Sequence, residues 1–146
     1  EAAGKILGRE NYDMYQPDCG KYAEESDVPQ IYELLLENFD LQADHIPSED
    51  ELLQIVKEKE VMLYKIGDKI ECFFIYRREG KKLYCAFSYN HTSADILYSI
   101  ERRVKEIEYE ENGIKMHYAW FNAENKKALR RNAWKDTKIR DYIFVK

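Results

Sequence analysis

The sequence predicts an α/β (α+β) fold in which a mixed, mostly antiparallel sheet is flanked by about four helices, in the order βααβββαβαβ. Apolar residues recur at helical spacing in the stretch before Glu60 and at the alternating spacing of strands after it. Residues 83–107 then read as a strand, a short polar loop and an amphipathic helix. At 146 residues the chain is long enough for one domain with a substantial core. We expect that domain at residues 20–146, after an arm or linker at 1–19.

The first part of the domain predicts an edge strand at residues 20–24 and two helices. Ser26 and Asp27 are typical helix-capping residues, and the helix that follows them runs to Asn38. After a loop at 39–47, a second helix begins at Ser48, which forms a capping-box pattern with Glu51. The apolar faces of the two helices are Val28, Ile31, Leu34 and Leu35, and Leu52, Ile55 and Val56.

Three strands follow at residues 61–66, 70–76 and 83–89. The pairs Gly67-Asp68 and Glu79-Gly80 are typical of the tight turns that join antiparallel strands. The sequence therefore predicts an antiparallel meander.

The loop after the third of these strands is the strongest candidate for a binding site. Thr92 and Asp95 have the spacing of a capping box, so we expect the next helix to begin at Thr92. A helix N-terminus next to a buried strand offers unpaired backbone N–H groups and a positive dipole end, which suit a phosphate. The same pattern is equally compatible with a plain strand–helix pair of the core that binds nothing. The apolar stripe of the helix is Ile96, Ile100, Val104 and Ile107.

The remainder of the chain predicts a further strand, a short helix and a last strand. Gly113 is a typical helix stop after Asn112, and bulky residues at 114–121 indicate a strand. Asn122 or Asn125 begins a basic helix at 126–134, and residues 139–145 alternate as a strand.

The overall charge of −5 argues against a general nucleic-acid or anionic-membrane binder. No apolar run approaches the length that a membrane-spanning helix needs. The three cysteines have no metal-ligand spacing, and we expect them to be reduced thiols of a cytoplasmic protein. The chain begins with Glu1, which is compatible with a piece excised from a longer protein. We predict no metal site.

The order of elements at this length resembles the GNAT N-acetyltransferase superfamily over residues 20–146. Three segments carry the resemblance. ESDVPQIYELL is similar to the usual first helix, ADILY to the end of the acetyl-CoA-binding motif, and NAENKKALRR to the late Asn-x-x-Ala helix start at Asn125 and Ala128. The chain departs from the family in its diphosphate loop, Gln/Arg-x-x-Gly-x-Gly/Ala, because only Ala94 matches and the loop has no glycine. It also has Asn132 where the family often has a tyrosine that protonates the leaving thiolate.

The resemblance implies acetyl-CoA as the cofactor and backbone N–H groups near residues 87–89 as donors to the developing oxyanion. The implied cofactor-binding residues are Phe87, Ser88, Tyr89, Asn90, His91, Thr92, Ser93, Ala94, Asp95, Asn125 and Ala128. Basic residues of the last helix are candidates for the 3′-phosphate of coenzyme A, and otherwise form a solvated face.

Candidate catalytic residues are His117, Tyr118 and Glu71 as base or relay, and Tyr89 as a group that reaches the thiolate. A single histidine among apolar residues is more often a packed core residue, so packing is the competing interpretation of His117. The resemblance implies that Phe39, Asp40 and His45 lie on one wall of the acceptor site.

The sequence thus predicts an enzyme that moves an acetyl group from acetyl-CoA to the amine of a small molecule or peptide by direct attack. The alternative is a GNAT-fold binding or regulatory module that has lost catalysis. We expect a monomer or homodimer and no nucleic-acid or membrane partner.

Overall fold

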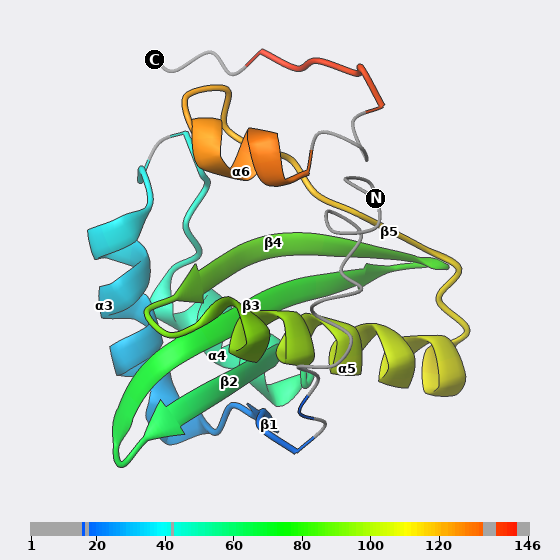
Figure 1. The fold of residues 1–146 in the computed structure, drawn as a ribbon. Coiled ribbons are helices and arrows are strands. Elements are labelled where there is room, and N and C mark those ends of the chain that lie inside the picture. Colours follow the sequence, from blue (N-terminus) through cyan, green and yellow to red (C-terminus); the bar gives the residue numbers. More distant parts are fainter. Residues whose placement is uncertain (1–15, 17, 42, 133–136, 143–146) are drawn as a thin grey trace.

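The computed structural model describes residues 16, 18–41, 43–132 and 137–142, and shows one five-stranded sheet with helices on both faces (Figure 1). The strands lie in the order β1-β2-β3-β4-β5. The first four are antiparallel neighbours, and β5 runs parallel to β4. The described elements are β1 (Lys21–Tyr22), η1 (Glu25–Asp27), α3 (Val28–Asn38), α4 (Glu49–Lys57), β2 (Val61–Ile66), β3 (Lys69–Glu79), β4 (Lys82–Asn90), α5 (Ala94–Asn112), β5 (Met116–Tyr118) and α6 (Lys126–Arg131).

The sheet separates two apolar clusters, because successive strand residues point to opposite faces. On one face α3 and α4 pack against residues such as Leu63, Phe73 and Ile75. On the other face the stripe predicted for α5, with Ile100 and Val104 at its centre, packs against residues of β2, β3 and β4. This arrangement leaves β4 and β5 at one side of the sheet, where α5 and the α3–α4 connection approach them from opposite faces (Figure 1).

Several local predictions are confirmed. Ser48 and Glu51 form the expected capping box, with Ser48 Oγ accepting from the Glu51 N–H and Glu51 Oε2 accepting from the Ser48 N–H. Gly113 ends α5 with a positive φ of 62°, which an L side chain rarely adopts. Gly67 and Gly80 have positive φ at the two meander turns.

The predicted start of α5 is wrong by two residues. The helix begins at Ala94 with Ser93 as its N-cap, and no side chain caps it. Thr92 is occupied elsewhere, because its N–H and its hydroxyl both donate to Asn90 Oδ1. Asp95 does not close a capping box, since its Oδ2 accepts from Gln16 Nε2. The start of α3 also differs, because the Asp27 carboxylate caps the preceding turn at the Glu24 N–H.

The predictions for the last part of the chain are corrected in length. β5 covers three residues rather than 114–121. The described residues 137–142 form no strand, and residues 143–145 of the predicted last strand lie outside the described residues. The described part of α6 ends at Arg131, and 133–134 likewise lie outside. Trp120 and Phe121 stay exposed, because a strand needs a partner and β4 is paired with β5 only up to Tyr118.

Candidate active site

The two strands at the candidate site lie side by side and then part. β4 pairs with β5 at Lys82–Met116, Leu83–His117 and Tyr84–Tyr118, and the pairing stops there. β4 continues from Cys85 to Asn90, a length of about 20 Å at the usual rise per residue. The two strands therefore pair over three positions only. The N–H and C=O groups on this edge of β4 have no β5 partner among the described residues.

A β-bulge bends β4 just where the strands part. Ile75 pairs with Phe87 and Tyr76 with Cys85, so Ala86 is an extra residue with no partner on β3. A bulge leaves the extra residue unpaired and re-aims the backbone next to it. The bulge therefore gives the open edge of β4 a local kink beside its first unpaired residues.

The loop at the far end of β4 offers backbone donors. The His91 N–H donates to the Glu71 carbonyl and the Thr92 N–H to Asn90 Oδ1, so these two are already used. No described residue accepts from the N–H groups of Ser93, Ala94 or Asp95, which lie at the positive end of the 19-residue helix α5. Asp95 opposes an anion here, and its Oδ1 is buried without a described partner.

The predicted catalytic residues are not brought together. Glu71 is buried at the start of β3, forms an ion pair with Lys69 and contacts the loop through its carbonyl. His117 and Tyr118 lie on β5 opposite the start of β4. Glu71 and Arg77, the partner of Tyr84, are six residues apart on β3, or about 20 Å. Glu71 therefore lies near the loop that follows β4, and Tyr118 lies near the point where β4 and β5 part.

Tyr118 forms a polar contact that sequence reasoning missed. Its hydroxyl donates to Glu79 Oε2 over 2.6 Å, and its ring lies 5.2 Å from the ring of Tyr84. The hydrogen bond to Glu79 raises the pKa of Tyr118 to about 12, so the phenol is protonated at neutral pH and is a poor base. Glu79 was predicted only as a turn residue and Tyr84 only as a strand residue. Knowledge of the β3–β4 and β4–β5 registers would have placed both residues next to Tyr118.

Tyr89 and Phe39 take packing positions. The Tyr89 ring stacks on Phe73 at 5.4 Å, within the cluster beneath α3 and α4. Phe39 meets the edge of Phe87 at 5.1 Å and so fixes the α3–α4 loop against β4. Phe87 is buried, whereas Ser88 on the next position is exposed.

Asp40 and His45 belong to the α3–α4 loop itself. Asp40 Oδ1 accepts from the Ala43 N–H, and Asp44 Oδ2 accepts from the Asp40 N–H, so these carboxylates hold the loop together. His45 is exposed and has a positive φ of 51°. The predicted wall residues therefore lie on a loop that reaches β4 through Phe39.

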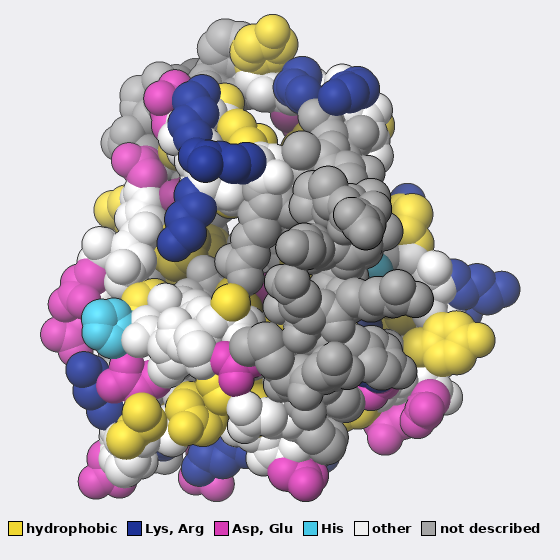
Figure 2. Space-filling model, viewed as in Figure 1, with side chains coloured by type: hydrophobic (Ala, Val, Ile, Leu, Met, Phe, Trp, Pro, Cys, Tyr) yellow, Lys and Arg dark blue, Asp and Glu magenta, His cyan; other side chains and the backbone are white. Residues whose placement is uncertain are grey.

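The helix α6 begins as predicted. Asn125 Oδ1 accepts from the Ala128 N–H, which makes Asn125 the N-cap. Asn132, at the position where the family often has tyrosine, donates through its side chain to the Ala128 carbonyl. Lys and Arg side chains gather over α6 on the face shown in Figure 2, where Lys126, Lys127 and Arg130 are exposed.

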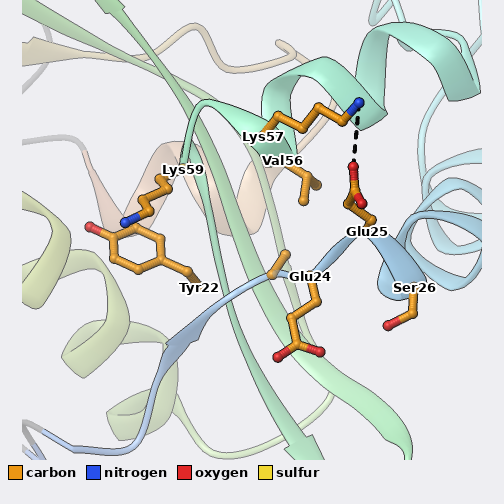
Figure 3. Close-up of a pocket in the computed structure, with 8 residues that line it drawn as sticks. Tyr22, Glu24, Glu25, Ser26, Val56, Lys57 and Lys59 are labelled. Atoms are coloured by element: carbon orange, nitrogen blue, oxygen red, sulfur yellow. Dashed lines mark ion pairs between the residues drawn. The ribbon is translucent and has the colours of Figure 1, made fainter.

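A shallow groove lies elsewhere on the molecule (Figure 3). It is formed by the region after β1, η1 and the end of α4, where Lys57 forms an ion pair with Glu25. Its lining residues are Tyr22, Ala23, Glu24, Glu25, Ser26, Val56, Lys57 and Lys59. None of the predicted site residues lines it, so the groove does not coincide with the candidate site.

Within residues 16, 18–41, 43–132 and 137–142, no group of three or more His, Cys, Asp or Glu is placed to hold a metal ion. In the same part of the chain, no helix is long and apolar enough to cross a membrane.

Comparison with known proteins gave matches in structure but not in sequence. No protein-family model matches the chain, and no curated protein matches it significantly. PaiA N-acetyltransferase from Thermoplasma acidophilum, solved with coenzyme A, matches with a TM-score of 0.66 at 12% identity over 85% of this chain and 91% of that chain. An aminoglycoside acetyltransferase, HMB0005, from an uncultured soil metagenomic sample matches with a TM-score of 0.61 at 10% identity over 86% and 94%. Rv2747 from Mycobacterium tuberculosis, solved with CoA, matches with a TM-score of 0.58 at 14% identity over 76% and 69%.

At such low identities the likeness establishes the fold alone. The chain has the fold of the GNAT acetyltransferases, in a divergent form, as its sequence predicted.

Proposed function

We propose that this protein is an acyl-CoA-dependent N-acetyltransferase that moves the acetyl group of acetyl-CoA to an amine by direct attack. The observation that carries the proposal is the open edge of β4, which runs from the last pair with β5 to the start of α5. An extended thioester arm fits along such an edge, with an anionic group at one end and a reacting carbonyl at the other. Two structural neighbours with this fold were solved with coenzyme A.

The chain's own groups for the cofactor are backbone donors and basic side chains. In this proposal the N–H groups of Ser93, Ala94 and Asp95, at the start of α5, hold the diphosphate. Every second residue of the open edge between Cys85 and Asn90 turns its N–H and C=O away from β3, toward the arm. The basic residues of α6 are the candidates for the 3′-phosphate. The loop lacks glycine and carries Asp95, and both features weaken binding without removing the donors.

At the other end of the edge, the backbone at the Ala86 bulge and the residues after it can donate to the thioester oxygen. A neutral amine uses its lone pair to form a bond with the thioester carbon, and the carbon–sulfur bond breaks with its electron pair going to sulfur. The nitrogen then gives up a proton, and sulfur takes one, either directly or through water. The products are an amide and a thiol, so atoms and charges balance.

Among the predicted catalytic residues, Tyr118 is best placed for this reaction. Its hydroxyl donates a hydrogen bond to Glu79, and this bond raises the pKa of Tyr118. We therefore assign Tyr118 the role of a hydrogen-bond donor and not that of a base. His117, the residue before it on β5, remains a candidate base. Glu71 is better assigned to the loop end, next to the diphosphate donors, than to the reacting carbonyl.

The three cysteines form no disulfide with one another, which agrees with a reducing, cytoplasmic location that we include in the proposal. The competing function is a GNAT-fold module without catalysis. The observations that favour it are the glycine-free loop and the side chain of Asn132, whose amide is too weak an acid to protonate a thiolate.

Thermal unfolding with acetyl-CoA tests the proposal. A ligand at about a hundred times its Kd stabilises the folded state by about 2.7 kcal/mol. For a domain of this size that raises Tm by roughly 5–10 °C, whereas free acetate leaves Tm unchanged. Turnover is then measured as thiol released with a panel of amines.

A matched variant tests the loop directly. Ala94→Pro removes one backbone donor at the first position of α5, where proline is tolerated, and Ser93 already has the extended backbone (φ −75°, ψ 156°) that precedes proline. We expect the fold to persist and the acetyl-CoA shift to shrink, with Ala94→Ser as the control. No shift at millimolar acetyl-CoA would reject the transferase in favour of the module. A shift without acetylation of any amine would instead indicate a cofactor-sensing domain.

A further inference from the structure

The charge of the chain is unevenly distributed along its length. Residues 115–146 contain nine Lys and Arg against three Asp and Glu, a net charge of +6, and because the whole chain carries −5, residues 1–114 carry −11. The overall charge, which argues against a general nucleic-acid binder, therefore conceals a basic last part of the chain. A protein polarised in this way repels an anion from most of its surface and attracts it to one part.

The basic residues of this last part lie at one end of the molecule. α6 and residues 137–142 both lie in the upper part of Figure 1. Figure 2 shows Lys and Arg side chains gathered there, whereas most Asp and Glu side chains of the same view lie nearer the opposite end. The exposed cations of these two segments, which we call the basic end, are Lys126, Lys127, Arg130, Lys138 and Arg140.

The positive charges on α6 are not offset by neighbouring carboxylates. Lys126, Lys127 and Arg130 form no ion pair with a described residue. Lys126 Nζ donates to a backbone carbonyl over 3.0 Å, which leaves its charge in place. Glu124, just before α6, and Asp141 are the described carboxylates of this region, so the cations outnumber them. The basic end therefore keeps a net positive charge for a partner.

Aromatic side chains are exposed in the same part of the chain. Trp120 and Phe121, in the connection from β5 to α6, are 51% and 46% exposed, and Tyr142 is 80% exposed. Leu129 on α6 and Ile139 are exposed as well. Apolar groups left in water among charged residues are typical of a surface that binds a partner. The rings alternate with the cations along the chain, and they decide the chemistry of that partner.

A chain of phosphates with accessible bases matches this combination. Lys and Arg neutralise phosphates, and a ring face stacks on a base of any type when that base is not held inside a duplex. We infer that the basic end, together with Trp120, Phe121 and Tyr142, binds a single-stranded nucleic acid. This inference names a binding partner and not an acetyl acceptor, and it does not rest on the proposed transferase function.

Other anions fit this surface less well. α6 has six residues, of which Ala128 and Leu129 are apolar, so it is too short and too polar to lie in the surface of an anionic membrane. An acidic polypeptide would neutralise the cations but would leave the exposed rings without flat partners to stack on. The 3′-phosphate of coenzyme A is one phosphate group, and five exposed cations suit a longer anion.

Fluorescence anisotropy with a labelled oligo-dT of about 12 nucleotides tests the inference on the full chain. If three or four phosphates are contacted, Kd should rise roughly 20- to 50-fold between about 50 and 200 mM salt. Lys127→Ala should weaken binding and reduce the slope of log Kd against log salt by about 0.7, the value for one phosphate contact. Lys21→Ala, which removes an exposed lysine of β1, is the matched control and should change neither quantity.

Substitution of the rings separates stacking from simple charge attraction. Trp120→Ala should raise Kd about fivefold or more without changing the salt slope, because stacking releases no counterions. Tyr142→Ala removes the most exposed of the three rings and should have the same effect, so the test stands even if Trp120→Ala unfolds. Tyr109→Ala, which removes an exposed ring from the acidic end of α5, is the matched control. Unchanged Kd values in both ring variants would overturn the inference.

Competing anions complete the test. No binding of oligo-dT at low salt would overturn the inference, and so would tighter binding of phosphatidylglycerol vesicles or equally tight binding of poly-glutamate. Oligo-dT binding that persists in millimolar coenzyme A would support a separate surface, whereas complete displacement would show that the basic end is only a cofactor phosphate site. The acetyl-CoA thermal shift is measured without the oligonucleotide, so each of the two proposals can fail without the other.

Discussion

Arg78 and Glu79 are neighbours on β3, yet Arg78 forms two ion pairs whereas Glu79 forms none with a described residue. Arg78 faces α5, where its Nε and Nη2 each donate to Glu108 over 2.7 Å, and Glu108 is completely buried. The remaining donors of Arg78 reach Glu60 and the carbonyls of Glu58 and Lys59. Glu79 faces the other way, is exposed, and has one described partner, the hydroxyl of Tyr118.

The comparison separates a charged group that stabilises the fold from one that does not. A buried charge must be paired and hydrogen-bonded, because the cost of removing it from water is otherwise not recovered. The Arg78 network meets that requirement and joins α5 to the end of α4 and to β3. An exposed carboxylate with one described hydrogen bond, such as Glu79, contributes little to stability.

We expect the largest effect on stability from breaking the ion pair between Arg78 and Glu108. Glu108→Gln removes the nearer of the two carboxylates that pair with the partly buried Arg78 guanidinium and leaves only Glu60, which should cost about 3 kcal/mol, the lower end for broken buried pairs. Tm should fall by roughly 6–12 °C, as measured by thermal unfolding. Glu79→Gln is the matched comparison and should change stability by less than about 0.5 kcal/mol. Equal losses in the two variants would show that the contrast between the regions is wrong.

A smaller effect is expected at Asp95, which like Glu79 forms no ion pair with a described residue but lies beside the loop donors. Asp95→Asn removes a negative charge from the first turn of α5, near the proposed diphosphate. The change should tighten acetyl-CoA binding by about 0.3–1 kcal/mol, or roughly two- to fivefold. Isothermal calorimetry measures this directly. An unchanged Kd would mean that Gln16, which bonds to Asp95 Oδ2, already holds the carboxylate away from the ligand.

The pH dependence of stability gives the smallest effect and sharpens the comparison through its sign. Burial raises the pKa of Glu60 above its ordinary value of 4.5, so its stabilising contribution is present below that pH and is lost as pH rises through the raised pKa. The backbone N–H and hydroxyl of Ser48 lower the pKa of Glu51, so its contribution is present above pH 4.5 and is lost as pH falls through the lowered pKa.

Urea unfolding at several pH values checks both signs. Relative to the unmodified protein, Glu60→Gln should become more stable as pH rises from 4.5 toward 7. Glu51→Gln should show its deficit above pH 4.5 and lose it in more acidic solution. Slopes of the same sign in the two variants would contradict the environments seen for these carboxylates.

The sequence by itself determined the local elements of this protein, because their signals depend on near neighbours in the chain. The Ser48–Glu51 capping box, the stop at Gly113 and the cap at Asn125 each need only three or four residues. The apolar stripe of α5 and the antiparallel meander follow from periodicity in the same way. These elements in this order were enough to predict the GNAT fold.

Only the tertiary structure decided the details of the candidate site. The extra residues Glu71 and Ala86 become bulges through pairing with other strands, and periodicity along one strand does not reveal that pairing. The same holds for the last pair between Tyr84 and Tyr118. The physical reason is that a strand's register is set by partners far away in the chain, whereas a helix forms its hydrogen bonds within itself. The sequence could therefore locate the diphosphate loop, but the contact between Glu79 and Tyr118 required the folded sheet.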